Sequence, residues 1–251
     1  MINSSTNNKI ITALSILAML LTWHGLALLI GKEYILPTPA QTGLSLLLIM
    51  QSQDFWPAVL LTVGRGLLGF LISLGLGIIL GMAAGFSRVI NWLLRPWVTV
   101  MRSTPVMSVI ILAIIWFESN LVPVVVAILM LFPIIYGNVV AGIRNINQEW
   151  LEMARMYKVK PRRIIAELYF PAILPYLLAG ATTAMGIAWK VIIAAEILSQ
   201  PTRAIGTDLM IAKFNFATAQ VLAWTVVVIM ISFVFESLLG AWENNLTNWR
   251  R

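Results

Sequence analysis

Long apolar segments recur along the whole chain, and they constrain its fold more than any other feature of the sequence. A transmembrane helix needs about 20 mostly apolar residues. Six segments have this length and character, and we predict transmembrane helices at residues 10–30, 57–86, 96–117, 121–143, 171–198 and 218–241. Only 11% of the residues are charged and 60% are hydrophobic, whereas a soluble domain carries roughly 25% charged residues. The sequence therefore predicts an all-α integral membrane protein with a single transmembrane domain over residues 1–251, embedded in a lipid bilayer.

Basic residues are distributed unevenly between the two predicted sides of the membrane. With six transmembrane helices both termini lie on one side, and that side carries eleven Lys and Arg residues against three on the other. The eleven are Lys9, Arg88, Arg95, Arg144, Arg155, Lys158, Lys160, Arg162, Arg163, Arg250 and Arg251, and the three are Lys32, Arg203 and Lys213. Because Lys and Arg concentrate in cytoplasmic loops, we expect both termini to be cytoplasmic.

Several function classes are disfavoured by what the sequence lacks. The chain has no cysteine, which excludes disulfides, thiol catalysis and Cys-ligated metals. A single histidine and scattered carboxylates argue against a membrane-embedded enzyme, and no GxxxxGK[ST] phosphate-binding loop occurs. We therefore expect no catalytic residue, metal site or bound cofactor in this chain. The net charge of +7 is explained by membrane topology, so we expect no nucleic-acid partner.

Residues 144–170 form the largest hydrophilic interruption between the apolar segments. This loop carries nine of the 27 charged residues of the chain. On a helix its residues Trp150, Met153, Ala154 and Tyr157 fall at i, i+3, i+4 and i+7, which places them on one apolar face. A short helix with such a face can dock in the groove of a partner protein, or it can pack on its own bundle or on lipid headgroups. The residues alone leave these alternatives open.

Small residues in the second apolar segment are spaced for close helix packing. Ser73, Gly77, Gly81 and Gly85 follow one another at intervals of four residues. Side chains of this size at this spacing let a second helix backbone approach closely. We predict tight packing along this face, either inside the bundle or across a dimer.

The charged loop and several other motifs resemble those of one family of transport proteins. "EMARMYKVKPRRIIAELYFPAILP" (152–175) is similar to the signature loop of ABC importer permeases: Glu152 and Ala154 match, Met153 replaces an alanine, and Lys158 stands where glycine is usual. "LPTPAQ" (36–41), "MRSTPVMSVIILAIIWF" (101–117) and "AWKVIIAAEIL" (188–198) resemble the nitrate, sulfonate and taurine branch of these permeases. The chain departs from the family pattern at "ESNLVP" (118–123) and at Lys190.

This resemblance implies the type I ABC importer permease fold, with six transmembrane helices and a cytoplasmic coupling helix, in a bacterial inner membrane. It implies a cytoplasmic ATPase dimer that binds ATP and Mg²⁺, an extracellular or periplasmic substrate-binding protein, and a second permease chain in a homodimer. The residues expected to contact the ATPase are Trp150, Glu152, Met153, Ala154, Tyr157 and Lys158. The expected substrate is a small anion such as nitrate, a sulfonate or taurine, with an aromatic or vitamin-precursor compound as the alternative. A secondary transporter or channel that works without an ATPase is the alternative function.

Ionisable residues within predicted transmembrane helices are the candidates for the translocation pathway. Such residues are costly in a bilayer and usually mark functional sites. The candidates are Arg65, Arg102, Lys190 and Glu196. Lys190 is expected either to attract an anionic substrate or to form a buried ion pair, for example with Glu118. An intrahelical pair with Glu196 is not expected, because residues six apart do not share a helix face.

Overall fold

The protein is helical throughout the part that the computed structural model describes, which comprises residues 4–247 and the side chains of residues 11–242. No strand occurs in residues 4–247. The α-helices follow in the order α1 (Ser4–Ile30), α2 (Pro39–Met50), α3 (Phe55–Phe86), α4 (Arg88–Ser103), α5 (Val106–Trp116), α6 (Val122–Arg144), α7 (Gln148–Met156), α8 (Pro161–Ile164), α9 (Phe170–Ser199), α10 (Ile205–Phe214) and α11 (Thr218–Thr247). A π-helix, Ile165–Tyr169, joins α8 to α9.

Five of the described helices, α1, α3, α6, α9 and α11, are long and apolar enough to cross a membrane. They confirm five of the six predicted apolar helices. The third, predicted at residues 96–117, is instead a bent pair in which α4 and α5 meet at 102°. Among the described residues, the helices that could span a membrane therefore number five, or six if this pair is one broken span.

The break between α4 and α5 has a local cause at Thr104 and Pro105. A residue that precedes proline is driven out of the helical region, and proline itself cannot donate a backbone hydrogen bond. Thr104 accordingly has ψ 128° and Pro105 has ψ 134°, both extended. The apolar character of this segment continues through the break, so hydrophobicity alone predicted one helix.

The core of the protein lies between α3, α6 and α9, and small residues on α3 bring α6 close to it. A Cβ atom on Gly77 would meet Ile135 at 2.6 Å, and one on Gly81 would meet Val139 at 2.8 Å. These distances are too short for any larger residue. The predicted close packing is therefore confirmed, and the partner helix belongs to the same chain.

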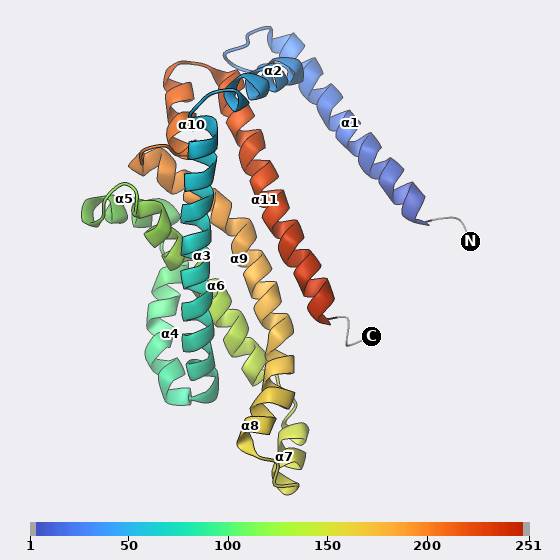
Figure 1. Cartoon of the computed structure of the whole chain (residues 1–251), viewed down its shortest axis with the longest axis vertical. Coiled ribbons are helices and arrows are strands. Elements are labelled where there is room, and N and C mark those ends of the chain that lie inside the picture. Colours follow the sequence, from blue (N-terminus) through green and yellow to red (C-terminus); the bar gives the residue numbers. More distant parts are fainter. Residues whose placement is uncertain (1–3, 248–251) are drawn as a thin grey trace.

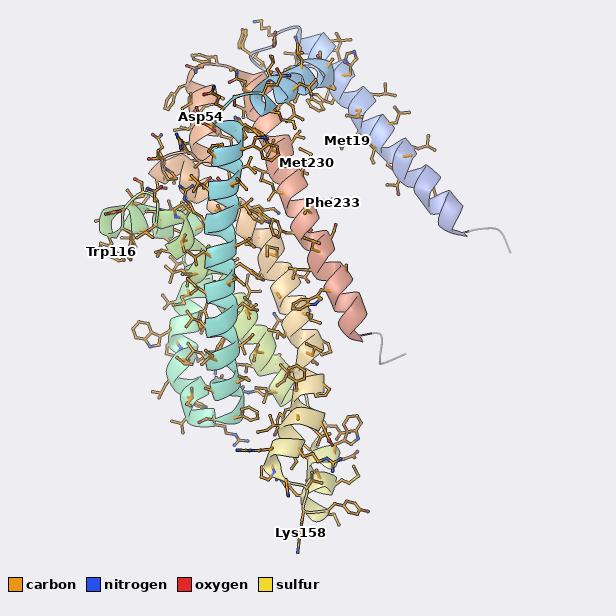
Figure 2. All side chains as sticks on the ribbon, viewed as in Figure 1. Met19, Asp54, Trp116, Lys158, Met230 and Phe233 are labelled. Carbon is orange, nitrogen blue, oxygen red and sulfur yellow. The ribbon has the colours of Figure 1, made fainter. Side chains whose placement is uncertain are left out.

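The two ends of the bundle differ in how the helices are gathered there. At one end, here called the α10 end, α2 and α10 pack around the start of α3 and α11 (Figure 1). At the other, the α7 end, α7 and α8 project beyond the remaining helices. Helix α1 diverges from the bundle on the side where α11 lies (Figure 2). Met19 of α1 and Met230 and Phe233 of α11 are all exposed. Lys158 lies at the tip of the α7 end.

Candidate functional site

Helix α7 carries an exposed apolar face at the tip of the molecule. Its N-terminus is capped by Asn147, whose side-chain oxygen accepts a hydrogen bond from the backbone nitrogen of Glu149 at 2.8 Å. Trp150, Met153 and Tyr157 are all exposed, and Tyr157 reaches 79%. Because nonpolar surface of this kind is favourably removed from water, this face is suited to dock on another molecule.

The buried side of α7 holds Leu151 and Ala154, so the predicted apolar face is divided. Ala154 is only 7% exposed and cannot belong to an outward docking surface. Leu151, which the helical spacing did not select, is buried beside it. Glu152 is exposed. The structure thus leaves Trp150, Met153 and Tyr157 as the outward apolar face, flanked by Glu152.

Lys158 ends α7 in a conformation that normally favours glycine. Its φ is +51°, in the left-handed region that a side chain disfavours. Its backbone nitrogen donates to the carbonyl of Arg155 at 3.0 Å, and the next nitrogen, of Val159, donates to the carbonyl of Ala154 at 2.9 Å. These are the two bonds of a Schellman motif. The geometry explains why glycine would suit this position and shows that the chain keeps the turn with lysine.

A short turn separates α7 from a nearly continuous helical rod. Beyond residues 158–160 the chain runs through α8, the π-helix and α9, and residues Pro161–Ser199 together form one candidate membrane span. The exposed face of α7 is therefore tied directly to the helix that packs against α3 and α6.

Arg65 and Glu196, two of the four pathway candidates, form an ion pair inside the bundle. Arg65 Nη1 lies 3.0 Å from Glu196 Oε1, and the Glu196 side chain is fully buried. Thr62 Oγ1 donates to the same carboxylate at 3.0 Å. The backbone nitrogen of Gly206 donates to Glu196 Oε2 at 3.1 Å. A buried carboxylate is stable only when it is paired and hydrogen-bonded in this way.

The other hydrogen bonds of Arg65 and Thr62 extend this cluster to neighbouring segments. Arg65 Nη2 donates to Asn120 Oδ1 at 2.9 Å and to the carbonyl of Thr202 at 3.2 Å. The backbone nitrogen of Ile205 donates to Thr62 Oγ1 at 3.1 Å. The cluster therefore joins α3, α9, the start of α10 and the loop before α6, and it fixes the α10 end of the bundle.

Lys190 and Arg102, the other two pathway candidates, are exposed and lie apart from that ion pair. Lys190 projects from α9, and no ion pair joins it to Glu118 or to another carboxylate that the structure describes. Arg102 lies against α6, with Nη2 3.0 Å from the position that a Cβ on Gly137 would take. The four candidates therefore divide into a satisfied pair and two uncompensated cations.

Sequence reasoning missed several residues that complete these features. Thr62, Asn120 and Gly206 contact the ion pair from distant parts of the chain, and no local pattern marks them. Arg88 and Arg95 are different, because they precede Arg102 at intervals of seven residues. That spacing places the three arginines on one face of a helix, and it could have been recognised.

Comparison with known proteins gives consistent results for sequence and fold. Residues 73–247 match the family described as "Binding-protein-dependent transport system inner membrane component". The aliphatic sulfonates transport permease SsuC of Bacillus subtilis is 30% identical over 86% of this chain and 78% of its own length. The taurine transport system permease TauC of Escherichia coli is 27% identical over 97% of this chain and 91% of its own.

A solved structure of the MetNI methionine ABC transporter, in an inward-facing conformation, supports the fold. One of its chains superposes with a TM-score of 0.58 at 17% identity, covering 76% of this chain and 94% of that one. At this identity the likeness concerns the fold alone.

Proposed function

Because the chain belongs to the family of binding-protein-dependent transport system inner membrane components, and so is the permease subunit of an ABC importer, we propose that it passes a small anion into a bacterial cell. Its partners in this proposal are a cytoplasmic ATPase dimer, a substrate-binding protein outside the membrane and a second copy of the chain. ATP and Mg²⁺ are bound by the ATPase subunits.

The exposed face of α7 is the observation that carries the coupling part of this proposal. Trp150, Met153 and Tyr157 present apolar surface at the tip of the molecule, beside the exposed charge of Glu152. Aromatic residues of this kind dominate the binding energy of many protein interfaces. The excess of basic residues at the α7 end supports a cytoplasmic orientation for it. We therefore place the ATPase on α7.

The route from the ATPase to the pathway runs through one short turn. When the docked ATPase subunits move, α7 moves with them, and the turn at Lys158 transmits this displacement to α8 and α9. Helix α9 packs against α3 and α6, so its displacement changes the packing of the bundle. The Arg65–Glu196 pair holds the α10 end together while the α7 end moves.

The substrate class is supported by the relatives and by the uncompensated cations. SsuC and TauC are named for sulfonates and taurine, and a further relative, CmpB of Synechococcus elongatus, is named for bicarbonate and is 29% identical over 61% of this chain. Each of these compounds carries an anionic oxygen group. Lys190 and Arg102, which are exposed in the single chain, would line the pathway and attract such a group, whereas Arg65 and Glu196 would support its walls.

Reconstitution tests this proposal directly. The chain is incorporated into vesicles with its ATPase and its binding protein, and uptake of taurine, an alkanesulfonate, nitrate and bicarbonate is measured with and without ATP. We expect ATP-dependent uptake of one of these compounds, each of which carries an anionic oxygen group. Transport without any ATPase would contradict the coupling proposal, and uptake of an aromatic or vitamin-precursor compound in place of an anion would contradict the substrate class.

Lys190 allows a sharper test of the pathway. Lys190→Met removes the charge and keeps a side chain of similar length, so we expect weaker uptake of the anion, seen chiefly as a higher KM. Lys32→Met, which changes an exposed lysine in the loop between α1 and α2, is the matched control. Equal KM values for Lys190→Met and the parent would exclude Lys190 from the pathway.

A further inference from the structure

Helix α4 carries a row of arginines along one face. Arg88, Arg95 and Arg102 are separated by seven residues, nearly two helical turns, and all three are exposed. The row extends from the start of α4 to its last turn, one residue before the end at Ser103. It is therefore a continuous basic stripe that points away from the apolar side of the helix.

Two adjoining pockets lie along this stripe. The first, of about 370 Å³, is lined by Asn91, Arg95, Thr99, Arg102, Tyr136 and Arg144, with Val98. The second, of about 540 Å³, shares Asn91, Arg95 and Arg144 with it and adds Arg88 of α4 and Arg155 of α7. The pockets thus form one groove between α4, α6 and α7, here called the arginine groove.

Among the described side chains, the arginine groove contains no compensating negative charge. No described Asp or Glu lines either pocket. Among the side chains that the structure describes, none of its five arginines takes part in an ion pair or donates a side-chain hydrogen bond. Guanidinium groups stay protonated in proteins, so five positive charges face a common space and repel one another.

Tyr136 provides an independent observation that points to a ligand in the groove. It lies in the wall of the first pocket and is only 5% exposed, yet its hydroxyl has no hydrogen-bond partner among the residues that the structure describes. Its ring is held by Phe132, with the ring centroids 5.7 Å apart. A buried hydroxyl without a partner costs free energy, and a ligand oxygen in the pocket would remove that cost.

We propose that the arginine groove is a binding site for an oxyanion, held by Arg95, Arg102 and Arg144 with the Tyr136 hydroxyl as a further donor. The planar guanidinium group binds two oxygens of a sulfonate, sulfate or phosphate at once. The inference rests on the proposed function for its orientation, which places the groove toward the cytoplasm. The oxyanion is then either a transported anion on its way out of the importer or the phosphate of an anionic lipid headgroup.

Thermal stabilisation of the purified chain by sulfate tests whether the arginine groove binds a soluble oxyanion. The chain, in a neutral detergent, is titrated with sodium sulfate at an ionic strength kept constant with chloride, and the shift in Tm is fitted to an apparent Kd. We expect a saturable shift. Arg102→Gln and Arg95→Gln should each weaken the apparent affinity about tenfold, as the loss of a charge-assisted hydrogen bond predicts. Lys32→Gln, a charge-matched change outside the groove, should leave it unchanged.

Two further variants separate binding from folding and charge from geometry. Tyr136→Phe removes only the hydroxyl and should weaken sulfate binding a few-fold. If an arginine variant fails to fold, this variant still tests the proposal. Arg102→Lys keeps the charge without the two-pronged donor, so its affinity should fall between those of the parent and Arg102→Gln.

Native mass spectrometry of the same preparations tests the lipid source. If the site holds a headgroup, the parent retains phosphatidylglycerol after delipidation in neutral detergent, and Arg102→Gln loses it while Lys32→Gln does not. The proposal would be overturned if Arg102→Gln reduced neither sulfate binding nor lipid retention more than Lys32→Gln does. Neither measurement involves uptake or an ATPase, so a failure here is distinguishable from a failure of the proposed transport function.

Discussion

Arg65 projects from α3 and Arg102 from the last turn of α4, and the surroundings of the two guanidinium groups are opposite in kind. Arg65 donates to Glu196, Asn120 and the carbonyl of Thr202 at the α10 end. Arg102 lies with four other arginines along the groove that leads to the α7 end, and no described carboxylate lines that groove. The guanidinium of Arg65 is thus paired within the chain, whereas that of Arg102 has no partner among the described side chains.

This difference indicates what each end is built for. Charges that are paired and hydrogen-bonded inside one chain fix the arrangement of its helices. The arginines of the groove and the exposed Tyr157 have no such partners among the described side chains, and we propose that they bind other molecules. We therefore expect the α10 end to be the more rigid one, and the proposed binding surfaces lie toward the α7 end.

Breaking the Arg65–Glu196 ion pair should have the largest effect on stability. Glu196→Gln leaves Arg65 largely buried without its counter-charge, and breaking one side of a buried pair costs about 3 kcal/mol or more. We expect the free energy of unfolding in detergent to fall by about this amount. The measurement is reversible unfolding of the purified chain, with Glu152→Gln, at an exposed position, as the matched control.

A double-mutant cycle sharpens this expectation. Arg65→Met with Glu196→Met removes both charges together, so the loss of stability should be smaller than the sum of the two single losses. Strictly additive losses would show that the two residues do not stabilise each other. The ion pair would then not hold the helices of the α10 end together.

The second largest effect is expected at the α7 end, on binding instead of stability. Trp150→Ala and Tyr157→Ala each remove an exposed aromatic group, so binding of the ATPase should weaken about 30-fold, as expected for a residue that contributes about 2 kcal/mol to an interface. Stability should change by no more than about 0.5 kcal/mol. Co-elution with the ATPase and unfolding of the chain alone measure the two quantities.

Leu151→Ala provides the contrasting variant on the same helix. Leu151 is buried on the inner side of α7, so its truncation should destabilise the chain by about 2 kcal/mol or more. If Trp150→Ala lowered stability as Leu151→Ala does, the outer face of α7 would be structural and the contrast between the two ends would fail.

The parts of the fold that the sequence predicted are those that depend on local composition. Five apolar segments of sufficient length became the helices α1, α3, α6, α9 and α11, because length and hydrophobicity decide whether a segment can cross a bilayer. Helix α10 was not predicted. It has ten residues, and its position depends on the contact between Gly206 and Glu196, which no local pattern reveals.

The candidate site was predictable in the same uneven way. Helical spacing found the residues of α7, but it could not tell which side the bundle covers, so Ala154 was assigned to the docking face. The ion pair joins residues 131 positions apart. Its formation depends on how α3 and α9 pack, and the sequence could mark Arg65 and Glu196 only as separate charges inside predicted helices.

A smaller, pH-dependent effect is expected at the α10 end. Burial, and secondarily the neighbouring Asp54, raises the pKa of Asp208 from 3.8 to about 6. The folded chain therefore holds this proton more tightly than the unfolded chain, and the resulting stabilisation is complete below about pH 4 and lost as the pH rises through 6. Because the carboxyl is partly solvated, we expect this contribution to the free energy of unfolding to be only about 1 kcal/mol.

Unfolding measured between pH 4 and 7 tests this contribution. The difference in stability between the parent and Asp208→Asn should change across that interval, and Asp54→Asn should move the change toward lower pH by removing a like charge. A difference that is constant over the interval would show that the carboxyl of Asp208 is not perturbed by the α10 end.

The smallest expected effect concerns the turn at Lys158, and it has the opposite sign. A left-handed residue with a side chain costs about 1 kcal/mol relative to glycine, so Lys158→Gly should stabilise the chain by up to about that amount. Lys160→Gly is the matched control, because Lys160 has an ordinary φ of −59° and glycine there should only increase the entropy of the unfolded chain. If both variants were destabilised equally, the turn would store no strain. If Lys158→Gly is more stable than the parent and binds the ATPase equally well, the lysine side chain is not needed for docking. The α7 end would then tolerate the strained turn because the two backbone hydrogen bonds of that turn fix the outward face of α7.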